Sequence, residues 1–269
     1  MIKLEGVTYR YGSRSETALE NVSLQIGVGE QVCIMGANGS GKSTLASLVA
    51  GLIKTDCGTV QIDVDGDAPL PVGILFQNPE NQMVAVTVEK EIAFALENLG
   101  VPFQEMEKRI ADTLKTFSIE HLRKRITSEL SGGEKQRVAL ASVMIFQPPV
   151  LVLDEPDSFL DESGRRALHT EEERIVRQEP TTTLVRITQY RSVAARYQRL
   201  IVFKDGRLIA DGDPQAILSD QSLCSDARLA FQYDKYHALK LPSGLDLSSN
   251  GADAVERIVA DSISFEYPG

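Results

Sequence analysis

An eight-residue run rich in glycine offers the clearest chemistry in the sequence. Gly36-Ala-Asn-Gly-Ser-Gly-Lys42-Ser43 matches the pattern GxxxxGK[ST] without a gap. Small residues let consecutive backbone N–H groups turn inward around phosphate oxygens, and a following helix adds its positive end. The Lys42 ammonium supplies a mobile charge, and the Ser43 hydroxyl is a ligand for magnesium. We expect the phosphates to be held by Gly36, Ala37, Asn38, Gly39, Ser40, Gly41, Lys42, Ser43 and Thr44.

Two adjacent carboxylates, Asp154 and Glu155, follow the continuous apolar run PPVLVL. Such a run is typical of a strand buried on both faces of a parallel sheet, and open α/β sheets bind ligands at the carboxyl ends of their strands. We expect Asp154 to hold magnesium through water, and Glu155 to orient and deprotonate the water that attacks a γ-phosphate. Alone, such a pair is more often a solvated strand end, so its meaning depends on the glycine loop.

These residues need elements to position them, and the apolar pattern predicts an α/β core. Short β-type runs occur at about 2–11, 21–26, 30–35, 58–63 and 72–76, and a helical run follows the glycine loop. Helical stripes cover 88–99 and 106–117, and Gly100 and Pro102 end the first of them. A helix-rich insert over about 77–146 is therefore predicted between two strand-rich parts.

The composition limits the class of protein. With 42% hydrophobic and 25% charged residues, the 269-residue chain is predicted to be globular. The net charge of −10 argues against a nucleic-acid partner, because phosphate binding calls for a basic face. Three cysteines without CxxC spacing favour a reduced cytosol and no zinc site. Neither a leader pattern nor an apolar run of about 20 residues is found, so a membrane function would require other subunits to cross the bilayer.

The run Leu130-Ser-Gly-Gly-Glu-Lys-Gln-Arg137 resembles the LSGGQ signature of the ABC ATPases and differs from it only at Glu134. The resemblance implies a P-loop NTPase core with a mostly parallel sheet, an antiparallel β subdomain and a helical insert. It also implies ATP and Mg²⁺ as ligands and a head-to-tail pair of domains. In such a pair, Ser131, Gly132 and Gly133 would contact the γ-phosphate held by the partner's glycine loop.

Other landmarks of that family occur in order. Tyr11 resembles the aromatic residue that stacks on adenine, with packing at a strand end as the alternative. Gln77, at the junction between core and insert, resembles the glutamine that touches magnesium and senses the membrane subunit. The run 158–161 resembles the D-loop that crosses between paired domains, and an ordinary surface loop stays open as the alternative.

The stretch from Phe76 to Pro102 resembles the energy-coupling-factor importers, which take up vitamins and metal ions such as cobalt and nickel. This resemblance implies a transmembrane coupling subunit as partner, and a cytoplasmic protein bound peripherally to the inner face of the cell membrane. Glu89, Glu91 and Glu97 are expected either to meet basic groups of that subunit or to form a solvated helix face.

The sequence departs from the family at the switch position, where Gln189 and Tyr190 replace the usual histidine and an acidic residue. An amide can donate a hydrogen bond to a γ-phosphate, but it cannot carry the charge or shuttle a proton. The catalytic residues are expected to be Lys42, Glu155 and Gln189, in a site that binds ATP better than it hydrolyses it.

The far end of the chain, residues 258–269, repeats its beginning in register, with Ile258 in the place of Ile2 and Tyr267 in the place of Tyr11. The predicted domains are an ABC ATP-binding domain over 1–220, an extension and linker over 221–257, and the start of a second ABC domain at 258. The partner domain would be another copy, a different ABC chain or a fused second half. The alternative function is a soluble tandem ABC protein that acts on ribosomes or DNA. The linker at 241–253 has no lysine or arginine, which favours transport.

Overall fold

A computed structural model describes residues 1–12, 17–64, 71–158 and 160–229. The chain divides into two units, Met1–Gln232 and Tyr233–Gly269, and all described residues belong to the first. Only 221–229 of the predicted extension is described. The predicted linker at 241–253 and the repeat at 258–269 lie outside the described residues.

The larger sheet has six strands in the order β5-β6-β7-β3-β8-β9. They are β3 (Gln31–Gly36), β5 (Val72–Leu75), β6 (Val150–Asp154), β7 (Thr183–Ile187), β8 (Arg199–Lys204) and β9 (Arg207–Gly212). All neighbours pair in parallel except β8 and β9. The mostly parallel sheet is confirmed, and β7 lies between β6 and β3. Their carboxyl ends, which lead to Asp154, Gln189 and the glycine loop, therefore meet at one edge.

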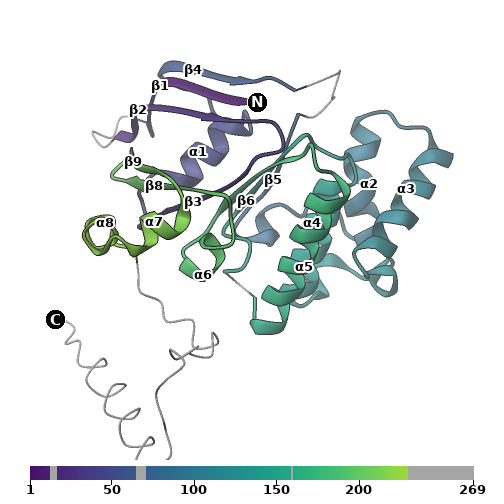
Figure 1. Ribbon diagram of the computed structural model, residues 1–269. Helices are drawn as coiled ribbons and strands as arrows, with labels where there is room; N and C mark the ends of the chain where they lie inside the picture. The colour runs from purple at the N-terminus through teal and green to yellow at the C-terminus, as the bar shows by residue number, and fades with distance from the viewer. Residues whose placement is uncertain (13–16, 65–70, 159, 230–269) are drawn as a thin grey trace, which may run out of the picture. The chain divides into compact units, whose positions relative to one another are not determined.

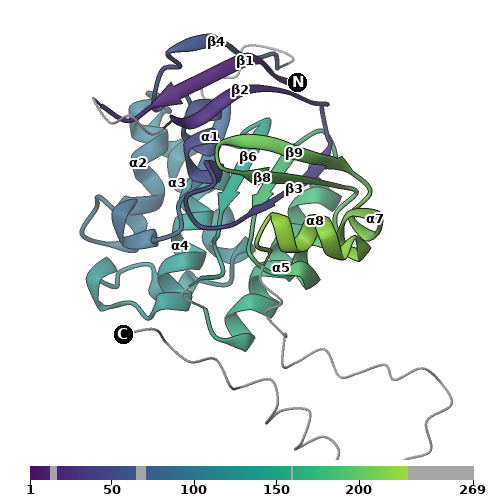
Figure 2. The ribbon, with the colours of Figure 1, turned by 90° about the vertical axis from the view of Figure 1, so that its left-hand side faces the viewer.

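A second sheet is antiparallel and has the order β2-β1-β4, formed by β1 (Ile2–Arg10), β2 (Thr17–Ile26) and β4 (Cys57–Ile62). This sheet is the predicted antiparallel β subdomain. Helix α1 (Lys42–Val49) lies beneath it (Figures 1 and 2). Leu45 and Leu48 of α1 share an apolar core with both sheets, which fixes the helix that begins at the glycine loop.

The central strands are buried on both faces, as the apolar run before Asp154 predicts. On β6, Val150 and Val152 join the core around α1, whereas Leu151 and Leu153 join a second core formed with the helices. All five residues of β6 are buried. Successive side chains point to opposite faces of a strand, so a strand that lies between two cores is apolar at nearly every position.

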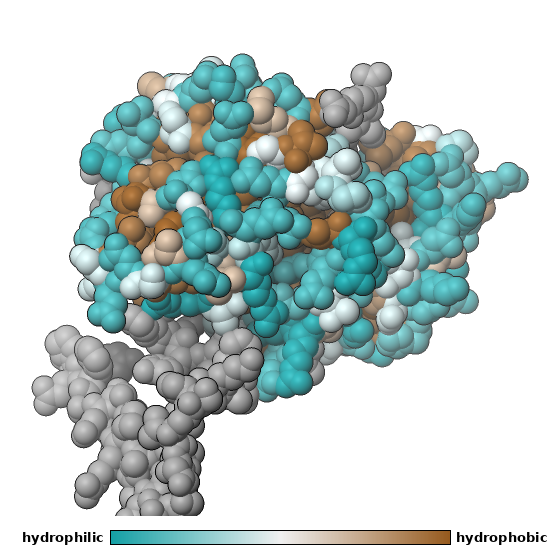
Figure 3. Space-filling view, in the orientation of Figure 1, coloured by the Kyte–Doolittle hydropathy of each residue, from teal (hydrophilic) through white to brown (hydrophobic). Residues whose placement is uncertain are grey.

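Helices cover the remaining faces of the large sheet. The second core packs α2 (Val88–Asn98), α3 (Phe103–Thr116), α4 (Gly132–Met144) and α5 (Glu162–Gln178) against β5–β7, with short turns η1 (Pro79–Asn81), η2 (Glu120–Leu122) and η3 (Thr127–Glu129). A third core holds α6 (Arg191–Ala194), α7 (Pro214–Ser219) and α8 (Gln221–Asp226). The predicted stop after α2 is confirmed, because Gly100 has φ +67°. The face in Figure 3 is mostly hydrophilic. Within the described residues no helix is long and apolar enough to span a membrane.

Candidate active site

The glycine loop joins the end of β3 to α1, and two of its glycines are required by close backbone contacts. Gly36 has φ +154°, and a Cβ there would lie 2.3 Å from the Phe203 carbonyl oxygen. Gly41 has φ +100°, and its Cβ would lie 2.5 Å from the Ala18 carbonyl oxygen. A side chain at either position would displace the loop. The loop then leads into the first turn of α1, whose N–H groups have no intrahelical acceptors.

Lys42 lies inside this loop and is buried. Its Nζ donates to the carbonyl oxygens of Gly36 and Ala37, each at 2.9 Å, and lies 4.0 Å from Oε1 of Glu155. Burial lowers the pKa of the Lys42 ammonium, and the charges of Glu155 and Asp154 oppose that shift. The ammonium is thus held between the loop and the two carboxylates predicted to act with it.

Asp154 ends β6 beside this lysine. Its Oδ1 is buried and accepts no hydrogen bond from any described residue, while the Ser43 hydroxyl contacts the carboxylate. Burial raises the pKa of Asp154, since charge is costly to desolvate. A buried carboxylate oxygen with spare capacity, next to a hydroxyl, is a donor set that suits Mg²⁺.

Glu155 is the point where the predicted site residues converge. The Gln189 amide donates to both of its carboxylate oxygens, at 3.0 and 2.9 Å, and also contacts Oδ1 of Asn38 at 2.9 Å. The Gln77 amide donates to Oε2 of Glu155 at 3.2 Å. Glu155 has φ +44°, and its N–H donates to the Ile187 carbonyl at 3.1 Å. Gln77, Gln189 and Lys42, from three different segments, therefore surround one carboxylate.

Tyr11 lies at the rim of the site, just beyond β1. Its hydroxyl is 3.2 Å from Oγ1 of Thr44, and its ring meets the ring of Tyr9 edge to face, with centroids 4.9 Å apart. The Tyr11 side chain remains 47% exposed. The geometry combines packing against a neighbouring ring with an open aromatic surface next to the glycine loop.

Ser131 directly precedes α4 and caps it. Its Oγ accepts from the Glu134 N–H, and the Glu134 carboxylate accepts from the Ser131 N–H at 2.7 Å, which is a capping box. These bonds hold the pKa of Glu134 below its ordinary value. Glu134, the one departure from the LSGGQ pattern, therefore caps the helix start, a role that glutamine can also fill. Ser131, Gly132 and Gly133 line a cavity of about 490 Å³ with α5 residues, and no glycine-loop residue lines it.

Comparison with known proteins agrees with this geometry. Residues 19–158 match the family model described as ABC transporter. The chain belongs to the ABC transporter family. It is an ABC ATPase of mixed α/β fold.

This ABC ATPase is similar to ATP-binding proteins of energy-coupling factor transporters. The chain is 39% identical over 224 residues to the energy-coupling factor transporter ATP-binding protein EcfA1 of Ligilactobacillus salivarius, covering 81% of this chain and 79% of that one. EcfA1 of Geobacillus kaustophilus is 40% identical over 224 residues, covering 81% and 80%. The solved structure of cbiO1 from Clostridium perfringens, part of the ABC transporter complex cbiONQ, aligns with a TM-score of 0.70 at 31% identity, covering 86% of this chain and 95% of that one.

One expectation for the ABC ATPase is wrong. Glu91 neither faces a partner nor forms a solvated surface, because it is buried and its Oε2 accepts from the N–H groups of Val84 and Ala85 at 2.9 and 2.7 Å. Glu89 is already paired with Arg123, whereas Glu97 is exposed. The helical period predicts that the side of α2 with Ile92 is buried. It does not show that the covered surface extends to Glu91, because that depends on the segment packed against the helix.

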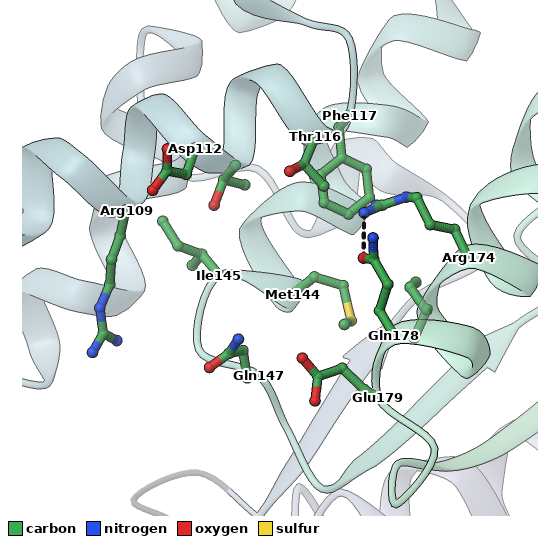
Figure 4. Close-up of a pocket in the computed structure, with 12 residues that line it drawn as sticks. Arg109, Asp112, Thr116, Phe117, Met144, Ile145, Gln147, Arg174, Gln178 and Glu179 are labelled. Carbon is green, nitrogen blue, oxygen red and sulfur yellow. Dashed lines mark hydrogen bonds between the residues drawn. The ribbon is translucent and has the colours of Figure 1, made fainter.

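Two other features of the ABC ATPase were not anticipated from its sequence. Arg186 is fully buried on β7 and pairs with Asp157 and Glu172. A charged residue inside an otherwise apolar strand was the available signal. The second feature is a cavity of about 310 Å³ between α3, the end of α4 and α5 (Figure 4). None of the predicted site residues lines it, and Arg174 beside it donates to Gln178 at 2.9 Å.

Proposed function

We propose that this chain binds and hydrolyses ATP to energise an energy-coupling-factor-type importer of a small solute such as a vitamin or a metal ion. The observation that carries the proposal is the convergence of the Gln77 and Gln189 amides on Glu155, next to Lys42 and the glycine loop. EcfA1 relatives of similar length support the class of transporter.

In the proposed reaction, the loop amides and Lys42 hold the β- and γ-phosphates of ATP. The phosphate oxygens would replace the two loop carbonyls as partners of the Lys42 ammonium. Glu155 would orient the attacking water and accept its proton. Ser43, Asp154 and Gln77 would hold Mg²⁺, which neutralises charge on the phosphate oxygens. The unpaired buried oxygen of Asp154 supports that assignment.

A second ABC domain would complete the site. Ser131, Gly132 and Gly133 line a cavity that shares no residue with the glycine loop of their own chain. Two glycines at a helix start suit contact with an anion, because they leave N–H donors exposed. The partner domain, whether another copy, a different ABC chain or a fused half, would present the γ-phosphate to these residues.

A transmembrane subunit would dock on the insert. Val84 and Val86 are 64% and 66% exposed, and Ile126 lies beside them because Thr87 and Ile126 form a β-bridge. We call Val84, Val86 and Ile126 the apolar patch. Glu91 accepts hydrogen bonds from the backbone of Val84 and Ala85, which holds this segment so that the valine side chains stay exposed. An exposed apolar patch on a rigid segment suits a protein partner. The chain would then lie in the cytoplasm, peripherally on the inner face of the membrane.

Purification of the tagged full-length chain from solubilised membranes tests the proposal. Hydrophobic membrane subunits should co-purify, and ATP hydrolysis should be much faster in that complex than for the chain alone. Replacing Val84 and Val86 by serine should prevent co-purification without changing ATP affinity. Sedimentation of the chain with ribosomes or DNA, and not with membranes, would instead support the soluble tandem class.

A further inference from the structure

A buried ion cluster lies directly behind the catalytic turn. Arg186 on β7 donates through Nη1 to Oε1 of Glu172 on α5, and its Nη2 lies 2.9 Å from Oδ2 of Asp157. The exposed fractions of Arg186, Asp157 and Glu172 are 0%, 2% and 4%. All three charges are therefore removed from water.

Stability alone gives a weak reason for such a cluster. Val185 and Ile187, on either side of Arg186, pack into the core around α1, so position 186 faces the opposite side of the sheet. A buried ion pair rarely contributes more stability than apolar side chains of similar volume. Nε of Arg186 and Oδ1 of Asp157 also lack partners within the described chain. The guanidinium instead fixes the positions of the two carboxylates, because its N–H donors form a rigid planar fork.

Asp157 belongs to the turn that carries Glu155. Ser158, the next residue, contacts Oε2 of Glu155 at 3.4 Å and the Gln77 amide at 3.3 Å through its hydroxyl. The Ser158 N–H donates to the Glu155 carbonyl at 3.1 Å, and the Leu160 N–H to the Asp157 carbonyl at 3.2 Å. A shift of Asp157 would therefore move both Glu155 and the start of the 158–161 loop.

Strand β7 holds this turn at two adjacent points. The Ile187 carbonyl accepts from the Glu155 N–H, and the neighbouring Arg186 side chain holds the Asp157 carboxylate. Glu155 has φ +44°, a conformation that L-residues keep only when their surroundings impose it. Glu172 lies on α5, outside the turn, where it also contacts His169 and Tyr197.

We infer that Arg186 is a positioning residue that fixes the turn of Glu155 through Asp157, with Glu172 as the second anchor of the guanidinium. The inference rests on the proposed function, since it names the part that holds the proposed base in place. Its consequence is that the two carboxylates of the cluster are not equivalent. Loss of the Asp157 charge should affect the chemistry, and loss of the Glu172 charge should affect only stability.

Matched isosteric variants test this. Asp157→Asn and Glu172→Gln each remove one charge from the same guanidinium. They are compared in the complete complex, with the glycine loop of the partner domain inactivated so that single-turnover hydrolysis reports on ATP bound to this chain. Asp157→Asn should slow that step by about 10-fold to 100-fold at unchanged ATP affinity, as a misplaced catalytic group does. Glu172→Gln should leave the rate within a factor of about two and lower the melting temperature.

Hydrogen exchange of the full-length chain gives a second readout that does not need turnover. Asp157→Asn should speed exchange at the Ser158 and Leu160 amides, whereas Glu172→Gln should speed it in α5. Equal rate losses in both variants, or unchanged exchange at Ser158 and Leu160 in Asp157→Asn, would overturn the inference. A wild-type complex without ATPase activity would refute the proposed function. The exchange comparison would still test whether Arg186 positions the turn.

Should Asp157→Asn not fold, Arg186→Lys takes its place, because it keeps the positive charge but not the fork. The expected result is slower single turnover with ATP affinity retained. Turnover equal to that of the wild-type protein would overturn the inference.

Discussion

At the scale of single residues, burial favours the neutral form of both Asp154 and Lys42. It raises the pKa of Asp154 and lowers the pKa of Lys42, because each charged form loses solvation. Their mutual attraction opposes both shifts without cancelling them. We therefore expect these two ionised groups to lower the stability of the fold relative to neutral groups, which is a common feature of active sites.

Replacing Asp154 by asparagine should stabilise the fold. The free energy of unfolding at neutral pH should rise, by up to about 2 kcal/mol, because the folded chain no longer has to ionise a buried carboxyl group. The folded pKa is raised above the ordinary value of 3.8, so wild-type Asp154 favours folding only in its protonated form. The advantage of Asp154→Asn should therefore shrink as the pH falls through the acid range.

Urea unfolding of both proteins at several pH values, with hydrolysis assayed in parallel, measures this effect. Asp112→Asn, at an exposed position on α3, is the control and should change stability little. A destabilised Asp154→Asn variant at neutral pH would show that the charge is favourable in the fold.

Replacing Lys42 by alanine should weaken ATP binding by about 100-fold, since hydrogen bonds from a charged donor contribute about 1.5–3 kcal/mol each. The domain should stay folded, because β3 and α1 are held by the apolar core and not by the lysine. Calorimetric titration with ATP measures the affinity, and Lys54→Ala, at an exposed position, is the control. Unchanged affinity in a folded Lys42→Ala protein would contradict the role of this loop.

At the scale of elements, one buried carboxylate connects α2 with the segment before it. Glu91 accepts two backbone N–H groups from residues 84 and 85, and Thr127 donates its N–H to the Val86 carbonyl at 3.0 Å. The segment is thus held from both sides, although it has no regular structure of its own. The conformation of the apolar patch depends on these bonds.

Glu91→Ala should destabilise the domain by about 1–3 kcal/mol, because it leaves two N–H groups without their acceptor. It should also weaken co-purification with membrane subunits by loosening the apolar patch. Thermal unfolding and pull-down from membranes measure the two effects. Glu97→Ala removes an exposed glutamate from the same helix and should do neither. Equal behaviour of the two variants would show that Glu91 does not organise this surface.

At the scale of the whole molecule, the two halves of the predicted chemistry lie apart. Asp154 and Glu155 lie beside Lys42 of the glycine loop, whereas Ser131, Gly132 and Gly133 line a separate cavity. The predicted switch residue is Gln189, whose amide donates to both carboxylate oxygens of Glu155. The amide donates these hydrogen bonds, but unlike histidine it cannot take up or release a proton. We therefore expect a pair of domains in which this chain mostly binds ATP and helps its partner to hydrolyse.

Two variants in the complete complex test this asymmetry. Glu155→Gln should cost little steady-state turnover, because it affects the slower site. Ser131→Ala should cost about 100-fold, the loss seen when a positioned transition-state donor is removed from the faster one. The steady-state ATPase rates of the two purified variant complexes, compared with the wild-type rate, measure both effects. Equal loss in both variants would mean that the two sites are equivalent or coupled, and that Gln189 does not mark a weaker site.

The sequence by itself determined the local chemistry of this protein. The glycine loop, the carboxylate pair after a buried strand and the stop of α2 at Gly100 depend on residue types within a few positions of one another. Backbone freedom, charge and hydrogen-bonding capacity are properties of those types and need no knowledge of distant segments. The family follows from the same short motifs.

The tertiary structure decided which groups meet. Glu155 and Gln189 are 34 residues apart, and their contact exists only because β6 and β7 pair in parallel. The burial of Glu91 and the pairing of Arg186 with Asp157 likewise depend on segments brought together from elsewhere in the chain. Periodicity predicts that one face of an element is covered. It does not identify the segment that covers the face, because two residues far apart in the sequence can lie at any distance in the folded chain.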